Sequence, residues 1–292
     1  KNIELLESKI MDANQIRFVI FISIFLLMLW LESFIKRHPT IDSKTRRLKI
    51  NLALTGIDIL VVRIFFGAAA LGASQFAEEK GWGLFNYLEL PEGLEALLCI
   101  VILDLMIYIQ HVMFHVIPLF WRFHVVHHSD LDLDVSSGLR FHPLEILASM
   151  FYKIGLVFAL GPSPMAVLVF EAILNGMALF SHSNITLPER LDRLLRYVFV
   201  TPDMHRIHHS VEKNETNSNF GFNLSIWDRA LGTYVHDALK PQPRIIIGVN
   251  AFRTSEEVSF KKLLMMPFRE IPESYSLSPK KNYGSNDRYD EK

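Results

Sequence analysis

The sequence predicts an all-α integral membrane protein, built as a bundle of about four to five transmembrane or hairpin helices. A cytoplasmic helical cap is expected to hold a histidine-rich di-metal site. Two observations lead to this fold class. Half of the 292 residues are hydrophobic, with a mean hydropathy of +0.22, which is too apolar for an ordinary soluble domain. Most of the 12 histidines stand in short clusters.

Five apolar stretches account for the membrane prediction, at residues 18–35, 50–74, 94–114, 146–160 and 165–180. The first three are long enough to cross a hydrocarbon core, which takes about 20 helical residues. The last two are shorter and are joined by Gly161-Pro162-Ser163-Pro164. This turn predicts a tight helical hairpin that either just spans the membrane or enters it and returns.

The flanks of these stretches predict the orientation. The loop 36–49 carries six basic residues against Asp42 alone, so the positive-inside rule assigns it to the cytoplasm. The first stretch lacks a small-residue cleavage site and is expected to be a retained anchor. Counting the crossings from this loop places every histidine cluster on the cytoplasmic face of the membrane.

Beyond residue 181 the chain is more polar, with an expected helix at 187–200, a short strand at 245–249 and a tail from 276 that looks disordered. We divide the chain into N-terminal membrane anchor spans (1–93), a catalytic region (94–240) and a C-terminal cytoplasmic segment (241–292).

Composition also excludes several classes of function. The formal charge of −1 offers no clustered basic excess for nucleic acid. Cys99 is the only cysteine of the sequence, which excludes a disulfide framework and cysteine-based metal sites. Any metal must therefore be held by His, Asp or Glu.

The histidine clusters predict a metal site. The pattern HxxHH occurs twice and HxxxH once, and it comprises His124, His127 and His128, then His205, His208 and His209, then His111 and His115. Positions i, i+3 and i+4 share one face of a helix, so each HxxHH cluster is expected to aim three imidazoles at a common point. Eight histidines exceed the four ligands of a closed zinc site, so two metals are expected.

Polar residues beside the clusters are candidate supports. Asp104 and Tyr108 share a helical stripe with His111 and His115, and an intramembrane carboxylate is costly. We predict that they serve the bound metals, with Asp104 orienting a histidine. The alternative is a pair between Asp104 and Arg63, or another polar group, that holds the bundle together.

Glu171, Asn175 and His182 form a similar stripe, which indicates His182 as a ninth ligand with polar support beneath it. A pair between Glu171 and Lys153 across the hairpin is the alternative for Glu171, and we prefer it.

His142 is either a further ligand or a helix-start contact that hydrogen-bonds Glu145. The isolated histidines His38 and His236 are interpreted as surface or internally satisfied residues.

With these motifs in hand, the sequence resembles the fatty acid hydroxylase superfamily of integral membrane di-metal enzymes, which includes sterol desaturases, lipid hydroxylases and alkylglycerol monooxygenase. The matching segments follow the family order over roughly residues 94–234. They are HVMFH (111–115), WRFHVVHHSD (121–130), RFHPLE (140–145), SHSN (181–184), TPDMHRIHHS (201–210) and NFGFNLSIWDRALGTY (219–234).

The resemblance implies a cytoplasm-facing di-iron site that activates dioxygen to hydroxylate, or desaturate, an unactivated carbon of a lipid such as a sterol or a fatty acyl chain. It carries the ligand role to the nine clustered histidines His111, His115, His124, His127, His128, His182, His205, His208 and His209, with His142 as a tenth candidate. The 219–234 segment offers no side chain expected to be catalytic, and we expect it to pack under the last cluster.

The expected cofactors are two iron ions, with zinc possible in the purified protein, dioxygen and an external electron donor. No glycine-rich dinucleotide fingerprint or fused haem domain is visible, so a separate ferredoxin, a protein of the cytochrome b5 type or a pterin is the expected reductant. No ER-retention motif is visible, and the bacterial inner membrane is preferred over the ER membrane.

Two other functions stay open at this point. A di-zinc membrane hydrolase would use the same imidazole ligands. A metal transporter or storage protein is disfavoured, because transport needs polar ligands along a path across the bilayer, whereas these histidines collect at one face.

Overall fold

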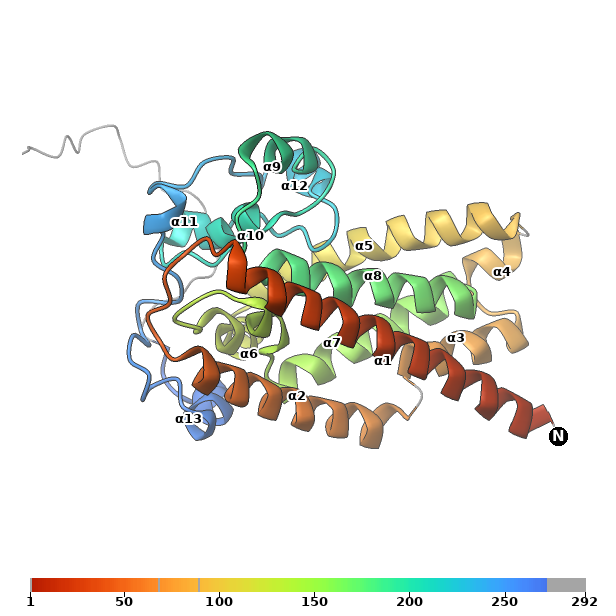
Figure 1. Ribbon diagram of the computed structural model, residues 1–292. Coiled ribbons are helices and arrows are strands. Elements are labelled where there is room, and N and C mark those ends of the chain that lie inside the picture. Colours follow the sequence, from red (N-terminus) through yellow and green to blue (C-terminus); the bar gives the residue numbers. More distant parts are fainter. Residues whose placement is uncertain (1, 68, 89, 272–292) are drawn as a thin grey trace, which may run out of the picture.

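The computed structural model describes residues 2–67, 69–88 and 90–271, and over these residues the chain is all-helical, without strands (Figure 1). Five helical segments are long and apolar enough to cross a membrane: Gln15–Phe34, Lys44–Leu88, Glu92–Val116, Pro143–Leu160 and Pro164–His182. The predicted fold class is confirmed, whereas the side of the membrane that the cap faces stays a prediction.

The long helices lie side by side, and most of the shorter elements gather as a cap at one end of the bundle (Figure 1). The bundle consists of α1 (Asn2–Phe34), α2 (Lys44–Phe66), α3 (Ala69–Lys80), α4 (Leu84–Leu88), α5 (Glu92–Val116), α7 (Pro143–Leu160) and α8 (Pro164–His182). The cap consists of α6 (Pro118–His128), η1 (Val135–Leu139), α9 (Glu189–Leu195), α10 (Pro202–His208), α11 (Lys213–Thr216), α12 (Ile226–Leu231), η2 (Gln242–Arg244), α13 (Phe260–Met265) and η3 (Met266–Phe268).

The second apolar stretch is interrupted rather than continuous. α2 ends before Gly67, whose φ is 55°, and α3 begins at Ala69, whose φ is 52°; positive φ angles of this kind interrupt a right-handed helix. α3 then packs against α7 and α8, and the hydroxyl of Ser74 donates to the carbonyl of Pro162 at 2.7 Å. The second half of this stretch therefore lies against the α7–α8 hairpin.

The hairpin turn depends on a glycine. Gly161 adopts a left-handed conformation at φ 61° and ψ 47°, and a Cβ there would lie 2.2 Å from the carbonyl oxygen of Trp82. Ser163 then caps α8, with its hydroxyl accepting from the amide of Ala166. Both helices of the hairpin are long and apolar enough to span.

Two expectations for the cap need correction. The helix expected at 187–200 is limited to Glu189–Leu195, because Phe199 leaves the helix to make an isolated bridge with Leu224. The 245–249 segment forms no strand, since Ile247 makes only an isolated bridge with Ser210. The tail from 276 lies outside the described residues.

One ion pair ties the α1–α2 connection to the cap, and a second joins α1 to α2. Arg37 binds the carboxylate of Asp203 through two hydrogen bonds of 3.0 and 2.6 Å, and Lys44 pairs with Glu32 at 2.7 Å. Several of the cations that predict the orientation of this loop are thus neutralised inside the protein.

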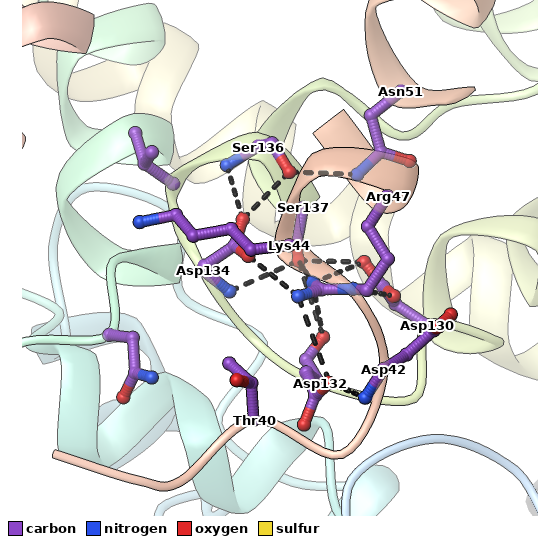
Figure 2. A network of polar contacts seen from close by, with 12 residues as sticks. Thr40, Asp42, Lys44, Arg47, Asn51, Asp130, Asp132, Asp134, Ser136 and Ser137 are labelled. Atoms are coloured by element: carbon purple, nitrogen blue, oxygen red, sulfur yellow. Dashed lines mark hydrogen bonds and ion pairs between the residues drawn. The ribbon is translucent and has the colours of Figure 1, made fainter. Parts of the chain in front are cut away.

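The centre of this junction is the buried guanidinium of Arg47, shown in Figure 2. It donates to both oxygens of Asp130, at 2.7 and 2.9 Å, and to Asp134 at 2.6 Å. Burial alone would raise the pKa of Asp130, but Arg47 and Arg140 hold it below its ordinary value. Because Asp130 follows α6 by two residues, the network fixes the end of the helix that carries the first HxxHH cluster.

Candidate metal centre

Nine buried histidines meet at the cap end of the bundle in two groups. Within each group, the candidate ligand nitrogens all lie within 4.8 Å of one another. The first group has five members and the second has four. They are His111, His115, His124, His128 and His208, and then His127, His182, His205 and His209.

Each HxxHH cluster is divided between the two groups, and does not converge on one point as expected. α6 gives His124 and His128 to the five-histidine group and His127 to the four-histidine group. The second cluster gives one histidine, His208, to the five-histidine group and gives His205 and His209 to the four-histidine group. At ~100° per residue, positions i+3 and i+4 diverge by a quarter turn, so one cluster can face two centres.

The remaining ligand candidates come from two membrane helices. His111 and His115 lie one turn apart on α5, and His182 is the last residue of α8. Both helices run to the cap end of the bundle, as Figure 1 shows. The cap and the bundle therefore contribute to both groups together.

The protonation of these histidines suits metal binding. Burial lowers the pKa of His124 to about 3, and burial and the neighbouring imidazoles lower the pKa of His128 and His209 well below 6.5. At neutral pH these rings are uncharged and offer lone pairs, as a metal ligand must. Both ring nitrogens of His128 and Nε2 of His208 are buried without a hydrogen-bond partner among the described residues. A bound cation would satisfy them.

Fixed acceptors orient five of the rings, one of them His127, whose Nδ1 lies 3.2 Å from the carbonyl of Arg140. Nδ1 of His124 lies 2.6 Å from a carboxylate oxygen of Glu145, and Nδ1 of His182 lies 2.7 Å from the carbonyl of Ala178. When Nδ1–H donates in this way, Nε2 is left free as a ligand.

Two further acceptors belong to one short segment. Nδ1 of His208 donates to the carbonyl of Ser218 at 2.7 Å, and Nδ1 of His111 donates to the carbonyl of Phe220 at 2.8 Å. Between these two residues, Asn219 has a φ of 51°. Asparagine tolerates this left-handed conformation better than most residues, so it allows both carbonyls to face the five-histidine group.

Asp228 holds this segment in place. Its carboxylate accepts the amides of Phe220 and Gly221 at 2.7 and 2.8 Å, together with the hydroxyl of Thr233 at 2.6 Å. The sequence alone predicted only packing for this segment. The one signal in the sequence was an aspartate, Asp228, within a largely apolar segment, and this signal does not indicate which groups the aspartate contacts.

Asp104 and Tyr108 support the same segment and do not orient a histidine directly. Asp104 accepts from the indole of Trp227 at 2.8 Å, and the hydroxyls of Tyr108 and Thr233 lie 2.8 Å apart. Arg63, the alternative partner of Asp104, is exposed. Asp104 therefore pairs with another polar group, the indole of Trp227, and contacts neither Arg63 nor a histidine.

Glu171 also lies away from the metal centre. It pairs with Lys153 at 3.0 Å, which confirms the preferred interpretation, and with Arg17 at 2.7 Å. Asn175 is exposed and gives no support to His182, whose partner is the Ala178 carbonyl.

His142 lies outside both histidine groups. Its Nδ1 accepts the amide of Leu144 at 3.1 Å and so caps α7, while its Nε2 lies 3.2 Å from the carbonyl of Leu264. Of the two sequence-based alternatives, the structure shows a helix-start contact, although with the backbone and not with the Glu145 side chain.

Comparison with known proteins agrees with this arrangement. The fatty acid hydroxylase family model matches residues 96–233, the part of the chain that carries all nine histidines. Residues 96–233 are therefore similar to the fatty acid hydroxylase superfamily, over somewhat less than half of the chain. No solved structure matches it.

Three relatives illustrate the range of the superfamily. Ornithine lipid hydroxylase OlsE of Rhizobium tropici is 34% identical over 155 residues, which cover 52% of this chain and 44% of the relative. Alkylglycerol monooxygenase of Xenopus tropicalis is 27% identical over 213 residues, 72% of this chain and 46% of the relative. Cholesterol 25-hydroxylase of Rattus norvegicus is 28% identical over 138 residues, which cover 47% of this chain and 45% of the relative. The matches thus span less than half the length of these relatives.

Proposed function

We propose that this protein is a membrane-bound di-iron, dioxygen-dependent oxidoreductase that hydroxylates, or desaturates, an unactivated carbon of a lipid. The observation that carries the proposal is the pair of adjoining histidine groups, five and four, on a membrane helical bundle. The names of the three relatives, two hydroxylases and one monooxygenase, each specify a lipid as the substrate.

The two groups fit two metal ions. Each supplies more imidazoles than chance would gather, all buried, and iron accepts this ligand type. The nine grouped histidines are the proposed ligands, and His142 is left out of the set. Two irons bound there would supply the activation of dioxygen that breaking an unactivated C–H bond requires.

Residues around the two histidine groups keep the imidazole rings neutral, orient them and exclude water from them. Phe141 stacks on His127 with ring centroids 4.7 Å apart, and Phe220 meets the rings of His115 and His208 at 5.1 and 5.6 Å. These aromatic contacts keep water away from the ligands. The Glu145 carboxylate holds the Nδ1 proton of His124, which leaves Nε2 for the metal.

The reaction requires partners. Hydroxylation of R–H by dioxygen consumes two electrons and two protons and gives R–OH and water. A separate ferredoxin, a cytochrome b5-type protein or a pterin is the proposed source of the electrons. The lipid is proposed to enter from the bilayer, since the ligand helices α5 and α8 are themselves candidate spans. The centre is proposed to face the cytoplasm of the bacterial inner membrane, or of an ER membrane.

Oxygen labelling tests the proposal. Purified protein, loaded anaerobically with ferrous iron and supplied with a chemical reductant, is incubated under ¹⁸O₂ with bilayers that contain ornithine lipid, alkylglycerol or cholesterol. We expect oxygen consumption above that of a His127→Ala variant and one ¹⁸O atom in the hydroxylated lipid. Lipid cleavage that proceeds without oxygen and with zinc bound would instead establish the hydrolase.

A further inference from the structure

Helix α9 exposes two leucines, and a charged pair at its end is buried. Leu191 and Leu194 are 42% and 66% exposed, whereas Asp192 and Arg196 are buried and joined by an ion pair of 2.6 Å. A cap helix surrounded by water would place its leucines inward and its charges outward. The exposed face of α9 therefore combines leucines that fit an apolar environment with the charged residues Glu189, Arg190 and Arg193.

The same apolar character continues onto the neighbouring turn and α12. Tyr197, Val198 and Phe199 are 66%, 44% and 42% exposed, and Leu231 of α12 is 56% exposed. Arg229 of α12 lies 5.4 Å from the ring centroid of Tyr197, which joins the two parts. We name these residues the α9–α12 surface: Leu191, Leu194, Tyr197, Val198, Phe199 and Leu231. A patch of this kind is typical of an interaction site.

The α9–α12 surface lies where the lipid-facing side of the bundle ends. The exposed residues Trp30 and Phe34, at 58% and 69%, reach the cap end of α1. The next residue, Ile35, accepts the amide of Thr186 at 2.7 Å, three residues before α9 begins. In Figure 1, α9 and α12 lie beside the end of the bundle, over α8 and α5, and Trp227 of α12 bonds Asp104 halfway along α5.

The charges around this surface suit a lipid headgroup layer. Arg190, Arg193 and Arg229 are exposed beside it, against Glu189. The guanidinium of Arg229 also lies 3.7 Å from the ring centroid of Tyr234. Tyrosine with arginine at the edge of an apolar surface is typical of segments at the membrane interface, and anionic headgroups attract such cations.

We propose that the α9–α12 surface inserts into the headgroup layer of the membrane that the bundle spans. It is linked to the segments beside the metal centre, because the amide of Val200, two residues before α10, donates to the carbonyl of Asn223 at 3.0 Å, and that of Ser225 donates to the carbonyl of Val198 at 2.9 Å. Contact of the α9–α12 surface with the headgroup layer would set how deep the metal centre lies relative to the lipid. The inference rests on the membrane-spanning bundle and does not depend on the reaction.

Site-specific fluorescence tests the proposal. Cys99 is buried and is the only cysteine of the sequence, so the parent protein serves as the labelling background. Leu194→Cys and, as a second probe, Tyr197→Cys are labelled with the environment-sensitive dye NBD. Leu239→Cys is the matched control, since Leu239 is 73% exposed and its amide donates to the side chain of Glu215 in α11. The full chain is placed in nanodiscs of phosphatidylethanolamine and phosphatidylglycerol, with and without nitroxide-labelled lipid.

We expect blue-shifted emission at positions 194 and 197, and quenching by the nitroxide lipid about twofold or more above that at position 239. Equal emission and equal quenching at the three positions would overturn the proposal. A blue shift that grows with the number of protein copies per disc, with no quenching by the nitroxide lipid, would also overturn the proposal. In that case a second copy would cover the surface. Bound metal in the labelled proteins, at the parental level, verifies that each is folded.

Discussion

The carboxylate of Glu145, at the start of α7, lies 2.6 Å from Nδ1 of His124 on α6. Both side chains are buried, and the second oxygen of Glu145 has no hydrogen-bond partner among the described residues. The contact therefore joins a membrane helix to the five-histidine group and sets which nitrogen of His124 faces it.

Glu145→Ala should weaken metal binding in this group by about 10- to 100-fold, because His124 loses the acceptor that orients it. Glu145→Gln should cost less, since the amide oxygen can still accept. Chelator competition on the metal-loaded protein measures the change. Glu171→Gln is the control, a buried carboxylate that contacts Lys153 and Arg17 and no histidine. Equal metal affinity in Glu145→Ala and the parent would contradict the orienting role.

Asp228→Asn should loosen the Phe220 carbonyl and hence His111, because the amide nitrogen that replaces one carboxylate oxygen cannot accept a backbone N–H. We expect about 10-fold weaker binding of one metal ion and a changed ligand-field spectrum after cobalt substitution. The exposed Asp237→Asn serves as control. A variant that loses thermal stability but keeps the parental cobalt spectrum would show that Asp228 is only structural.

His142 should affect stability and not metal content. His142→Ala removes the cap of α7 and should cost about 1 kcal/mol of the free energy of unfolding, with all bound metal retained. Loss of a metal ion in this variant, at the level seen in His127→Ala, would restore His142 to the ligand set.

The same cap predicts a pH dependence. Burial keeps the pKa of His142 below 6.5, so its stabilisation is present above pH 6.5 and is lost as the pH falls through the lower folded-state pKa. Asparagine also caps helices and does not titrate in this range. The thermal stability of His142→Asn should therefore fall less on acidification than that of the parent, and an equal fall in both would contradict the assignment.

Arg47→Met should be among the most damaging substitutions in the protein. It would leave the buried carboxylates of Asp130 and Asp134 without their cation, at a cost of about 3–5 kcal/mol. Arg47→Lys should recover only part of this, since one ammonium cannot reproduce the forked contacts visible in Figure 2. Unfolding in detergent, followed by circular dichroism, measures both. Parental stability in Arg47→Met would refute this role of the network.

The sequence was sufficient to predict the spans and the nine-histidine set, because both follow from local patterns. Apolar length marks a span such as Glu92–Val116, and close spacing marks a cluster such as His124 to His128. The division of each cluster between two groups could not be predicted, since it depends on how α6 and α10 face one another.

The orienting contacts were beyond local patterns for the same reason. His111 meets the carbonyl of Phe220 across 109 positions, and Asp104 meets Trp227 across 123. Spacing along one helix placed Asp104 on the histidine stripe, but the partner that it finds depends on the packing of α12 against α5.

Metal content in paired variants tests the central claim most directly. Elemental analysis of the iron-loaded parent should give about two ions per chain. His127→Ala with His209→Ala removes two ligands from the four-histidine group and should leave one ion, as should His128→Ala with His208→Ala for the other group. His127→Ala with His128→Ala takes one ligand from each and should weaken both ions. A parent that binds no metal after anaerobic reconstitution, or loss of a single ion from the His127–His128 pair alone, would contradict the account.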